Sequence, residues 1–167
     1  MKRHKNFWQV TEDSLDKSMK AYEIDSSMRN ELLDLYKILS PFKEVPKVLK
    51  SLKEKDFELA ILSNGTPSLL DELVKSNNLE NIFDDIFSIE EVGVYKPDSK
   101  VYDLPINQYH IQKNEVVFLS ANTWDVSGGG NYGYNSIWVN RSNNTFDNLD
   151  YVPKHQIKDL SKLLDIL

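Results

Sequence analysis

One stretch of the sequence decides the fold: Leu59-Ala60-Ile61-Leu62-Ser63-Asn64-Gly65-Thr66-Pro67. An apolar run of this length that ends in turn residues is typical of a buried strand in a parallel sheet. Thr66 followed by Pro67 predicts the start of a helix, with threonine as the N-cap. Ser63 and Asn64 therefore lie at the carboxyl end of the strand, which is the edge where open α/β sheets bind their ligands.

Strands alternate with helices along the rest of the chain. We expect strands within 82–89, 115–119 and 136–139, and helices within 7–39 (as a hairpin), 45–55, 68–76, 98–109 and 157–166. Pro105 is expected to interrupt or kink its helix. This alternation predicts an α/β fold with a doubly wound parallel sheet, divided into a small helical part over 1–40 and a core over 41–167.

Composition excludes several classes of protein. The net charge of −6 argues against nucleic-acid binding. The sequence contains no cysteine, which excludes thiol chemistry. The one basic run, Lys2-Arg3-His4-Lys5, is expected to be a solvated terminus. No long apolar stretch follows Met1, so we expect no signal peptide, no membrane span and a cytoplasmic location.

Polar side chains gather in three loops at the predicted binding edge. They are Ser63 and Asn64, then Lys96, and then Ser120, Asn122 and Asp125. Each alone has an ordinary structural explanation, as a turn residue, a surface lysine or an acidic residue in the first turn of a helix. Because the carboxyl ends of parallel strands meet at one edge, the three loops together predict a site.

The motifs resemble those of the haloacid dehalogenase superfamily, and more narrowly the L-2-haloacid dehalogenases (type II). They are Leu62-Ser63-Asn64-Gly65, Val94-Tyr95-Lys96-Pro97-Asp98 with Val101-Tyr102, and Ser120-Ala121-Asn122-Thr123-Trp124-Asp125. The segments 7–13 and 41–46 resemble the family's helical cap and the exit from it, and 137–141 its last strand. The resemblance implies a Rossmann-like core with a partial helical cap.

The resemblance also implies a reaction, which is hydrolytic removal of halide from short 2-haloalkanoic acids through an aspartyl ester. It makes Ser63 and Asn64 the holders of the substrate carboxylate and the departing halide, and Lys96 the cation that positions the nucleophile. Tyr102, Ser120, Asn122 and Asp125 would support that pair and orient water. Phe7 and Trp124 match the apolar pocket wall, although either could be a core residue. No cofactor is implied, and a homodimer remains open.

The third motif separates this chain from related phosphatases. By resemblance, phosphatases of the superfamily carry acidic residues here that hold Mg²⁺, whereas Asp125 is the one carboxylate in the Ser120–Asp125 loop. The sequence therefore predicts no metal, and a magnesium phosphatase stays the enzymatic alternative. A serine hydrolase is disfavoured because His4, His110 and His155 are scattered and no Gly-x-Ser-x-Gly motif occurs.

One part of the family pattern is missing from the 167 residues. The family begins with a strand ending in Asp-x-Tyr-Gly-Thr, whose aspartate is the nucleophile, and that strand lies at the centre of the sheet; neither it nor the cap arginine occurs here. We therefore expect an amino-terminally truncated dehalogenase that is inactive alone. The alternative is a non-catalytic remnant that associates with another chain. Pro105 and the triplet Gly128-Gly129-Gly130, which is unfavourable within a helix, suggest relaxed selection.

Overall fold

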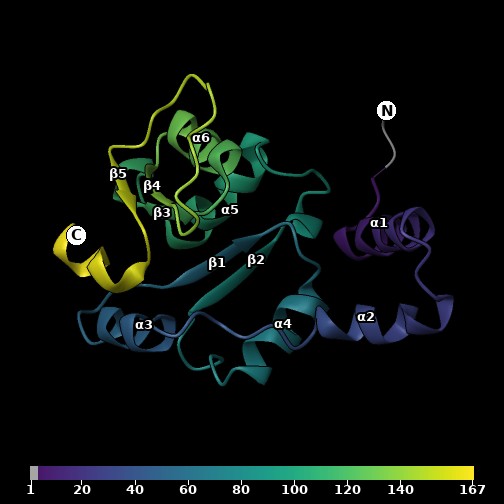
Figure 1. Ribbon diagram of the computed structural model, residues 1–167. Helices are drawn as coiled ribbons and strands as arrows, with labels where there is room; N and C mark the ends of the chain where they lie inside the picture. The colour runs from purple at the N-terminus through teal and green to yellow at the C-terminus, as the bar shows by residue number, and fades with distance from the viewer. Residues whose placement is uncertain (1–3) are drawn as a thin grey trace.

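The computed structural model describes residues 4–167 (Figure 1). The α-helices are α1 (Phe7–Ala21), α2 (Arg29–Leu35), α3 (Val45–Lys53), α4 (Pro67–Ser76), α5 (Ser99–Tyr109) and α6 (Thr123–Tyr132). The strands are β1 (Ala60–Ser63), β2 (Asp85–Ser88), β3 (Val117–Ser120), β4 (Asn135–Val139) and β5 (His155–Ile157). Short 3-10 helices are η1 (Ser26–Met28), η2 (Ile89–Glu91), η3 (Lys113–Glu115) and η4 (Leu160–Asp165).

All strand pairings in the described residues are parallel, as the α/β prediction requires. β1 pairs with β2, with Leu62 opposite Phe87. β3 pairs with β4 and β4 with β5, with Ser120 opposite Trp138. Within residues 4–167 these strands form two sheets, β1-β2 and β3-β4-β5, so β1 and β3 each have one edge without a strand partner.

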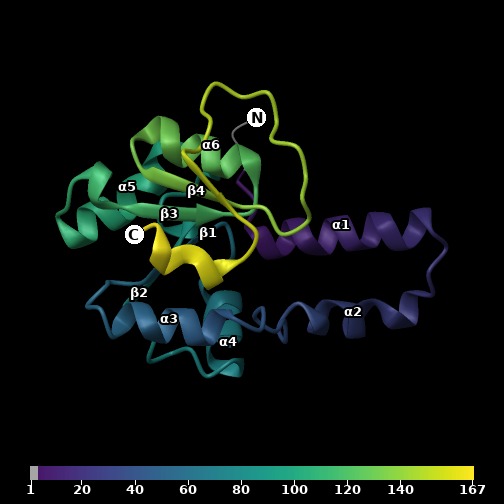
Figure 2. The same cartoon turned by 60° about the vertical axis from the view of Figure 1, so that its left-hand side comes forward.

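The first two helices form the predicted hairpin. Asn6 caps α1 by accepting a hydrogen bond from the backbone N–H of Gln9 at 2.9 Å. Figure 2 shows α1 and α2 side by side, extending away from the sheets. Trp8 packs edge-on against Tyr36 at 6.5 Å, and Arg29 bonds Asp16 at 2.6 Å, so aromatic and charged contacts both join the helices. The division of the chain at residue 40 stays a prediction.

The main hydrophobic core joins the middle of the chain to its end. Three buried residues of α3 pack with β4, β5 and η4; the cluster is Val48, Leu49, Leu52, Ile137, Val139, Ile157 and Leu163. At the exit from the helical hairpin, Arg141 forms an ion pair with Glu44 at 2.5 Å and lies 3.7 Å from the ring centroid of Phe42. The segment that leads into α3 is therefore bound to the loop after β4.

The structure corrects two predictions about helices. The segment 157–166 forms the end of β5 and then η4 rather than an α-helix. Its apolar residues recur every three positions, a spacing that matches the three residues per turn of a 3-10 helix. The second prediction concerns Pro105, which does not interrupt its helix: α5 continues through this buried residue to Tyr109, and a kink at Pro105 stays a prediction.

The basic run near the amino terminus is only partly described. Lys2 and Arg3 lie outside the described residues. His4 and Lys5 are exposed, as the prediction of a solvated terminus requires, although His4 also contacts Glu90 at 3.0 Å and Lys5 pairs with Asp13. The amino-terminal segment is therefore attached to η2, which follows β2.

The three consecutive glycines lie within α6 and have a packing role. A Cβ atom at Gly129 would lie 2.7 Å from Cδ1 of Phe118, and one at Gly130 would overlap the ring of Tyr151. The helix approaches β3 and the segment near Tyr151 too closely for side chains at these positions. This packing replaces our interpretation of the glycines as relaxed selection.

Candidate active site

The candidate site is centred on a buried ion pair between two loops. Lys96 lies in the loop between β2 and α5, and its Nζ atom is 2.7 Å from Oδ2 of Asp125 in the first turn of α6. The side chains are only 8% and 4% exposed. Lys96 Nζ also donates to the backbone carbonyl of Leu62 at 3.1 Å. One ammonium group therefore connects the end of β1 with the start of α6.

Tyr102 of α5 is the second donor to Asp125. Its hydroxyl donates to Oδ1 at 2.9 Å, and the residue is fully buried. Burial, and then the nearby charge of Asp125, raise the pKa of Tyr102 far above its ordinary value, so the phenol keeps its proton and remains a donor. Both carboxylate oxygens of Asp125 thus accept a hydrogen bond, which fixes the carboxylate in one orientation.

Ser63 and Asn64 hold the turn after β1. Asn64 Oδ1 accepts the backbone N–H of Lys96 at 3.2 Å, while Ser63 Oγ accepts the N–H of Gly65 at 3.0 Å. Since these oxygens are used as acceptors, the amide NH₂ of Asn64 and the hydroxyl proton of Ser63 are the groups each can offer to an anion. Ser88 at the end of β2 donates to the carbonyl of Gly65 at 2.7 Å and keeps the turn against the sheet.

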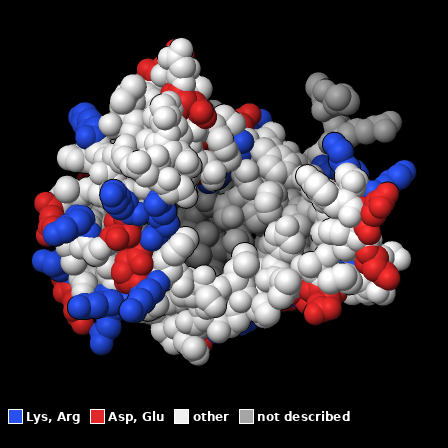
Figure 3. Space-filling model, in the orientation of Figure 1, with Lys and Arg blue, Asp and Glu red and all other residues white. Residues whose placement is uncertain are grey.

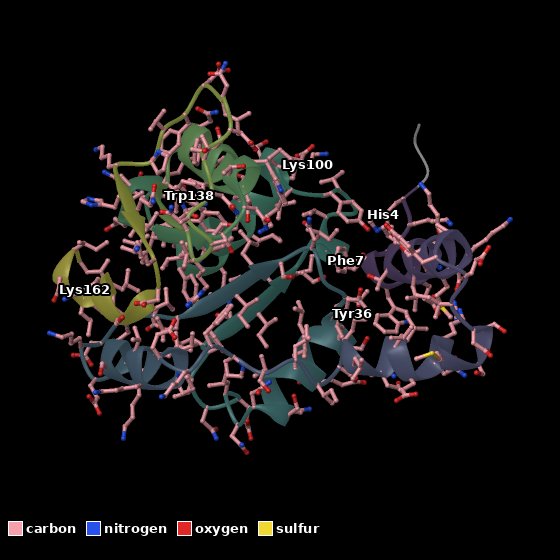
Figure 4. The ribbon with its side chains drawn as sticks, viewed as in Figure 1. His4, Phe7, Tyr36, Lys100, Trp138 and Lys162 are labelled. Atoms are coloured by element: carbon pink, nitrogen blue, oxygen red, sulfur yellow. The ribbon has the colours of Figure 1, made fainter. Side chains whose placement is uncertain are left out.

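Ser120 and Asn122 lie in the loop that precedes Asp125. Ser120 Oγ accepts the backbone N–H of Asn122 at 3.2 Å, and the Asn122 side chain is exposed and makes no capping bond to α6. Trp138 of β4 (Figure 4) donates from Nε1 to the carbonyl of Ala121 at 3.1 Å. A buried tryptophan on the neighbouring strand β4 therefore holds the Ser120–Asp125 loop through its backbone.

The two aromatic candidates differ in their surroundings. Phe7 is half-buried at the end of α1 that lies nearest to β1 and β2 (Figure 4). Tyr95, which precedes Lys96, donates its hydroxyl to the carbonyl of Lys5 at 2.8 Å, so the start of α1 is attached to the Lys96 loop. Trp124 is 40% exposed, so the alternative that it is a core residue is wrong.

Hydrogen bonds therefore connect four of the predicted residues in one network, namely Asn64, Lys96, Tyr102 and Asp125. Sequence reasoning missed the carbonyl of Leu62 and the ring of Phe118, whose centroid is 5.4 Å from Lys96 Nζ. Both belong to apolar strands, whose pattern predicts burial and gives no sign of a contact with a cation.

Two open cavities lie outside the network. One cavity of about 350 Å³ opens between the starts of α1 and α4, and another of about 630 Å³ lies beside Pro97 and Gly128; neither is lined by Lys96 or Asp125. In residues 4–167, no three acidic or histidine side chains are grouped closely enough to hold a metal ion. The arrangement can thus hold a cation and a carboxylate in contact with both side chains buried.

The chain is similar to a known protein family and to proteins of known structure. The model of the haloacid dehalogenase-like hydrolases matches residues 3–139. The chain belongs to this family. The (S)-2-haloacid dehalogenase of Pseudomonas sp. strain YL is 36% identical over 168 residues, which cover 99% of this chain and 72% of that protein. The family predicted from the three motifs is confirmed.

Solved dehalogenase structures have the same fold. An L-2-haloacid dehalogenase is 31% identical with a TM-score of 0.95, over 99% of this chain and 74% of that one. The L-2-haloacid dehalogenase of Xanthobacter autotrophicus, solved with chloropropionic acid covalently bound, is 25% identical with a TM-score of 0.90, over 98% of this chain and 76% of that one. None of the helices within residues 4–167 of this dehalogenase-like chain has the length and apolar character needed to cross a membrane.

Proposed function

We propose that this chain forms the cation-bearing part of an (S)-2-haloacid dehalogenase site, which releases halide from short 2-haloalkanoic acids. The observation that carries the proposal is the buried network in which Lys96 contacts Asp125 at 2.7 Å and Asn64 accepts the Lys96 N–H. It is supported by the dehalogenase relatives and by the solved relative that holds chloropropionic acid covalently.

The proposed chemistry has two steps. An aspartate carboxylate attacks C2 of the substrate, and the carbon–halogen bond breaks as its electron pair leaves with the halide. The resulting ester is then cleaved by water, which yields the 2-hydroxy acid with inverted configuration and restores the carboxylate. Lys96 holds a fixed positive charge where the carboxylate must be positioned, and a buried charge acts more strongly than one in water.

The attacking carboxylate is not Asp125 in this proposal, because the family's nucleophile is the aspartate of Asp-x-Tyr-Gly-Thr, whereas Asp125 belongs to the Ser120–Asp125 motif and is buried against Lys96 and Tyr102. The 167 residues contain no Asp-x-Tyr-Gly-Thr sequence, and we infer that a further polypeptide segment supplies the nucleophile. Support comes from the edges of β1 and β3 that lack a strand partner in the described residues. In the orientation of Figure 1, the molecular surface in Figure 3 is hollowed near its middle, close to the end of β1. We propose that the chain alone is inactive.

The remaining site residues have proposed roles that follow the same arrangement. Ser63 and Asn64 donate to the substrate carboxylate and the departing halide, and Ser120 and Asn122 orient the water with the help of Tyr102 and Asp125. Phe7 and the exposed ring of Trp124 form the apolar wall. Residues 1–40 act as the partial cap over a core formed by 41–167. A homodimer and a cytoplasmic location remain predictions.

A magnesium phosphatase is the alternative within the family. It requires carboxylate oxygens for the metal, whereas Asp125 of this site gives one oxygen to Lys96 and the other to Tyr102. The proposed dehalogenation needs no metal, since its leaving group is a halide. Mg²⁺ dependence is therefore a clear discriminator between the two reactions.

The test measures chloride release from (S)-2-chloropropionate. The 167-residue chain is assayed alone and after fusion to a segment that carries the family's Asp-x-Tyr-Gly-Thr strand. We expect release by the fusion only, and loss of that release in Lys96→Met. Lys100→Met is the matched control, because Lys100 is exposed at the start of α5 (Figure 4).

Two outcomes would overturn the proposal. A folded fusion that releases no chloride but hydrolyses p-nitrophenyl phosphate with Mg²⁺ would establish the phosphatase alternative. Full activity of the 167-residue chain alone would show that the nucleophile lies within it, against the role given to the further segment.

A further inference from the structure

Gly128 lies where no side chain can fit. It follows Asp125 by three residues on α6, so both face the same side of the helix. A Cβ atom at Gly128 would lie 2.5 Å from the hydroxyl oxygen of Tyr102 and 2.7 Å from Cβ of Pro97. Carbon atoms in contact lie about 3.5–4 Å apart, so at least one neighbour would have to move.

Both neighbours are tied to the candidate site. The Tyr102 hydroxyl is the donor to Asp125 Oδ1, and Pro97 directly follows Lys96, the donor to Oδ2. Tyr102 cannot easily give way, because its ring is edge-on to Phe118 at 5.8 Å and to Tyr134 at 5.9 Å, and the residue is fully buried. A side chain at position 128 would thus push on both groups that hold Asp125.

We propose that Gly128 is a positioning residue, which lets Tyr102 and the Lys96–Pro97 segment pack directly against α6 and so keeps both donors on the Asp125 carboxylate. Its catalytic importance rests on the proposed dehalogenase function, whereas its effect on the network geometry does not.

The neighbouring glycines provide a matched control. Gly130 lies in the same helix, and the substitution Gly130→Ala brings the same gain in helix propensity as Gly128→Ala. Its Cβ would overlap the ring of Tyr151 and not a donor to Asp125. Gly129 is a poorer control, since its Cβ would contact Phe118, which packs on Tyr102.

The first experiment observes the Lys96 ammonium group directly. In the 167-residue chain labelled with ¹⁵N-lysine, the Lys96 NH₃⁺ signal is assigned by its loss in Lys96→Met. We expect Gly128→Ala to shift or abolish this signal, while Gly130→Ala, also checked for folding by circular dichroism, keeps it at the wild-type position. An unchanged signal in folded Gly128→Ala would overturn the proposal, as would an equal change in Gly130→Ala.

A second experiment measures stability, so it remains informative if Gly128→Ala is too unstable for the lysine spectrum. Tyr102→Phe removes the nearest oxygen, so Gly128→Ala should lower the melting temperature less in that background than in the wild type. Equal losses in the two backgrounds would contradict the proposal. In the fused dehalogenase we expect Gly128→Ala to reduce kcat at least tenfold and Gly130→Ala to stay within about twofold. The lysine spectrum remains interpretable even if the fusion releases no chloride, so the two proposals fail separately.

Discussion

The ammonium of Lys96 and the carboxylate of Asp125 form an ion pair at 2.7 Å although 28 residues separate them in the sequence and each side chain is more than nine-tenths buried. Burying two charges costs desolvation free energy, which their attraction and further hydrogen bonds must offset. Leu62, through its carbonyl, and Tyr102 supply those bonds. A pair of this kind serves a defined geometry more than it serves stability.

Removing one partner of this pair should nevertheless destabilise the fold strongly, because the other charge stays buried without its partner. Lys96→Met leaves Asp125 buried with an uncompensated charge, and we expect the free energy of unfolding to fall by about 3–5 kcal/mol. Urea denaturation followed by circular dichroism measures the loss. Lys100→Met, on the exposed start of α5, should stay within about 0.5 kcal/mol. Equal losses in Lys96→Met and Lys100→Met would show that the substitution at Lys96 does not leave Asp125 as an uncompensated buried charge.

The phenol of Tyr102 should make stability depend on pH at the alkaline end. Burial raises its pKa in the folded state, so its contribution is complete below the ordinary tyrosine pKa near 10 and is lost as the pH rises above it. The unfolding free energy of the wild type should thus fall above pH 10, and Tyr102→Phe should flatten that fall. Urea titrations at pH 8 and 10.5 test this. Parallel pH profiles for the two proteins would contradict it.

The ion pair between Arg141 and Glu44 should contribute in the acidic range. The hydrogen bond from Arg141 lowers the pKa of Glu44, so this contribution is present above the ordinary glutamate pKa near 4.3 and disappears as the pH falls. We expect Arg141→Ala to cost about 1 kcal/mol at pH 7, partly through lost stacking on Phe42, and less at pH 3. A cost that does not change between the two pH values would exclude the carboxylate as the partner.

The packing of η4 on α3 should be a main source of stability. Leu163 is 2% exposed in this core, and Leu163→Ala should lower the free energy of unfolding by about 2–5 kcal/mol. Leu167→Ala is the comparison, because Leu167 is 46% exposed and should lose well under 1 kcal/mol. Thermal melts of both variants give the order of stability; a smaller loss at position 163 would contradict this packing.

The contacts among the candidate site residues could be anticipated from the sequence where residue chemistry and position along the chain coincide. Polar residues in three loops at the predicted binding edge, among them Lys96 and Asp125, predicted a site, and the family resemblance then suggested a role for each residue. The structure joins Lys96 and Asp125 directly. Such residues can be predicted from the sequence because polar groups at the end of a buried strand usually belong either to a turn or to a binding site.

Features that depend on distant packing were not predicted. Pro105 remains within α5, and the last helix is the 3-10 helix η4, because burial against other elements outweighs local preference. The triplet of glycines had the same difficulty. Its local cost in a helix is visible in the sequence, but the nearness of Phe118 to α6 is visible only in three dimensions.

The cluster that α3 shares with β4, β5 and η4 bears on how the chain folds during synthesis. Val48, Leu49 and Leu52 emerge from the ribosome about a hundred residues before Leu163, which covers them in the native structure. Contacts between such distant residues form slowly, and exposed apolar faces aggregate while they wait. The apolar face of α3 therefore stays exposed in the nascent chain until Leu163 has been synthesised. A chaperone that shields α3 should raise the yield of folded protein.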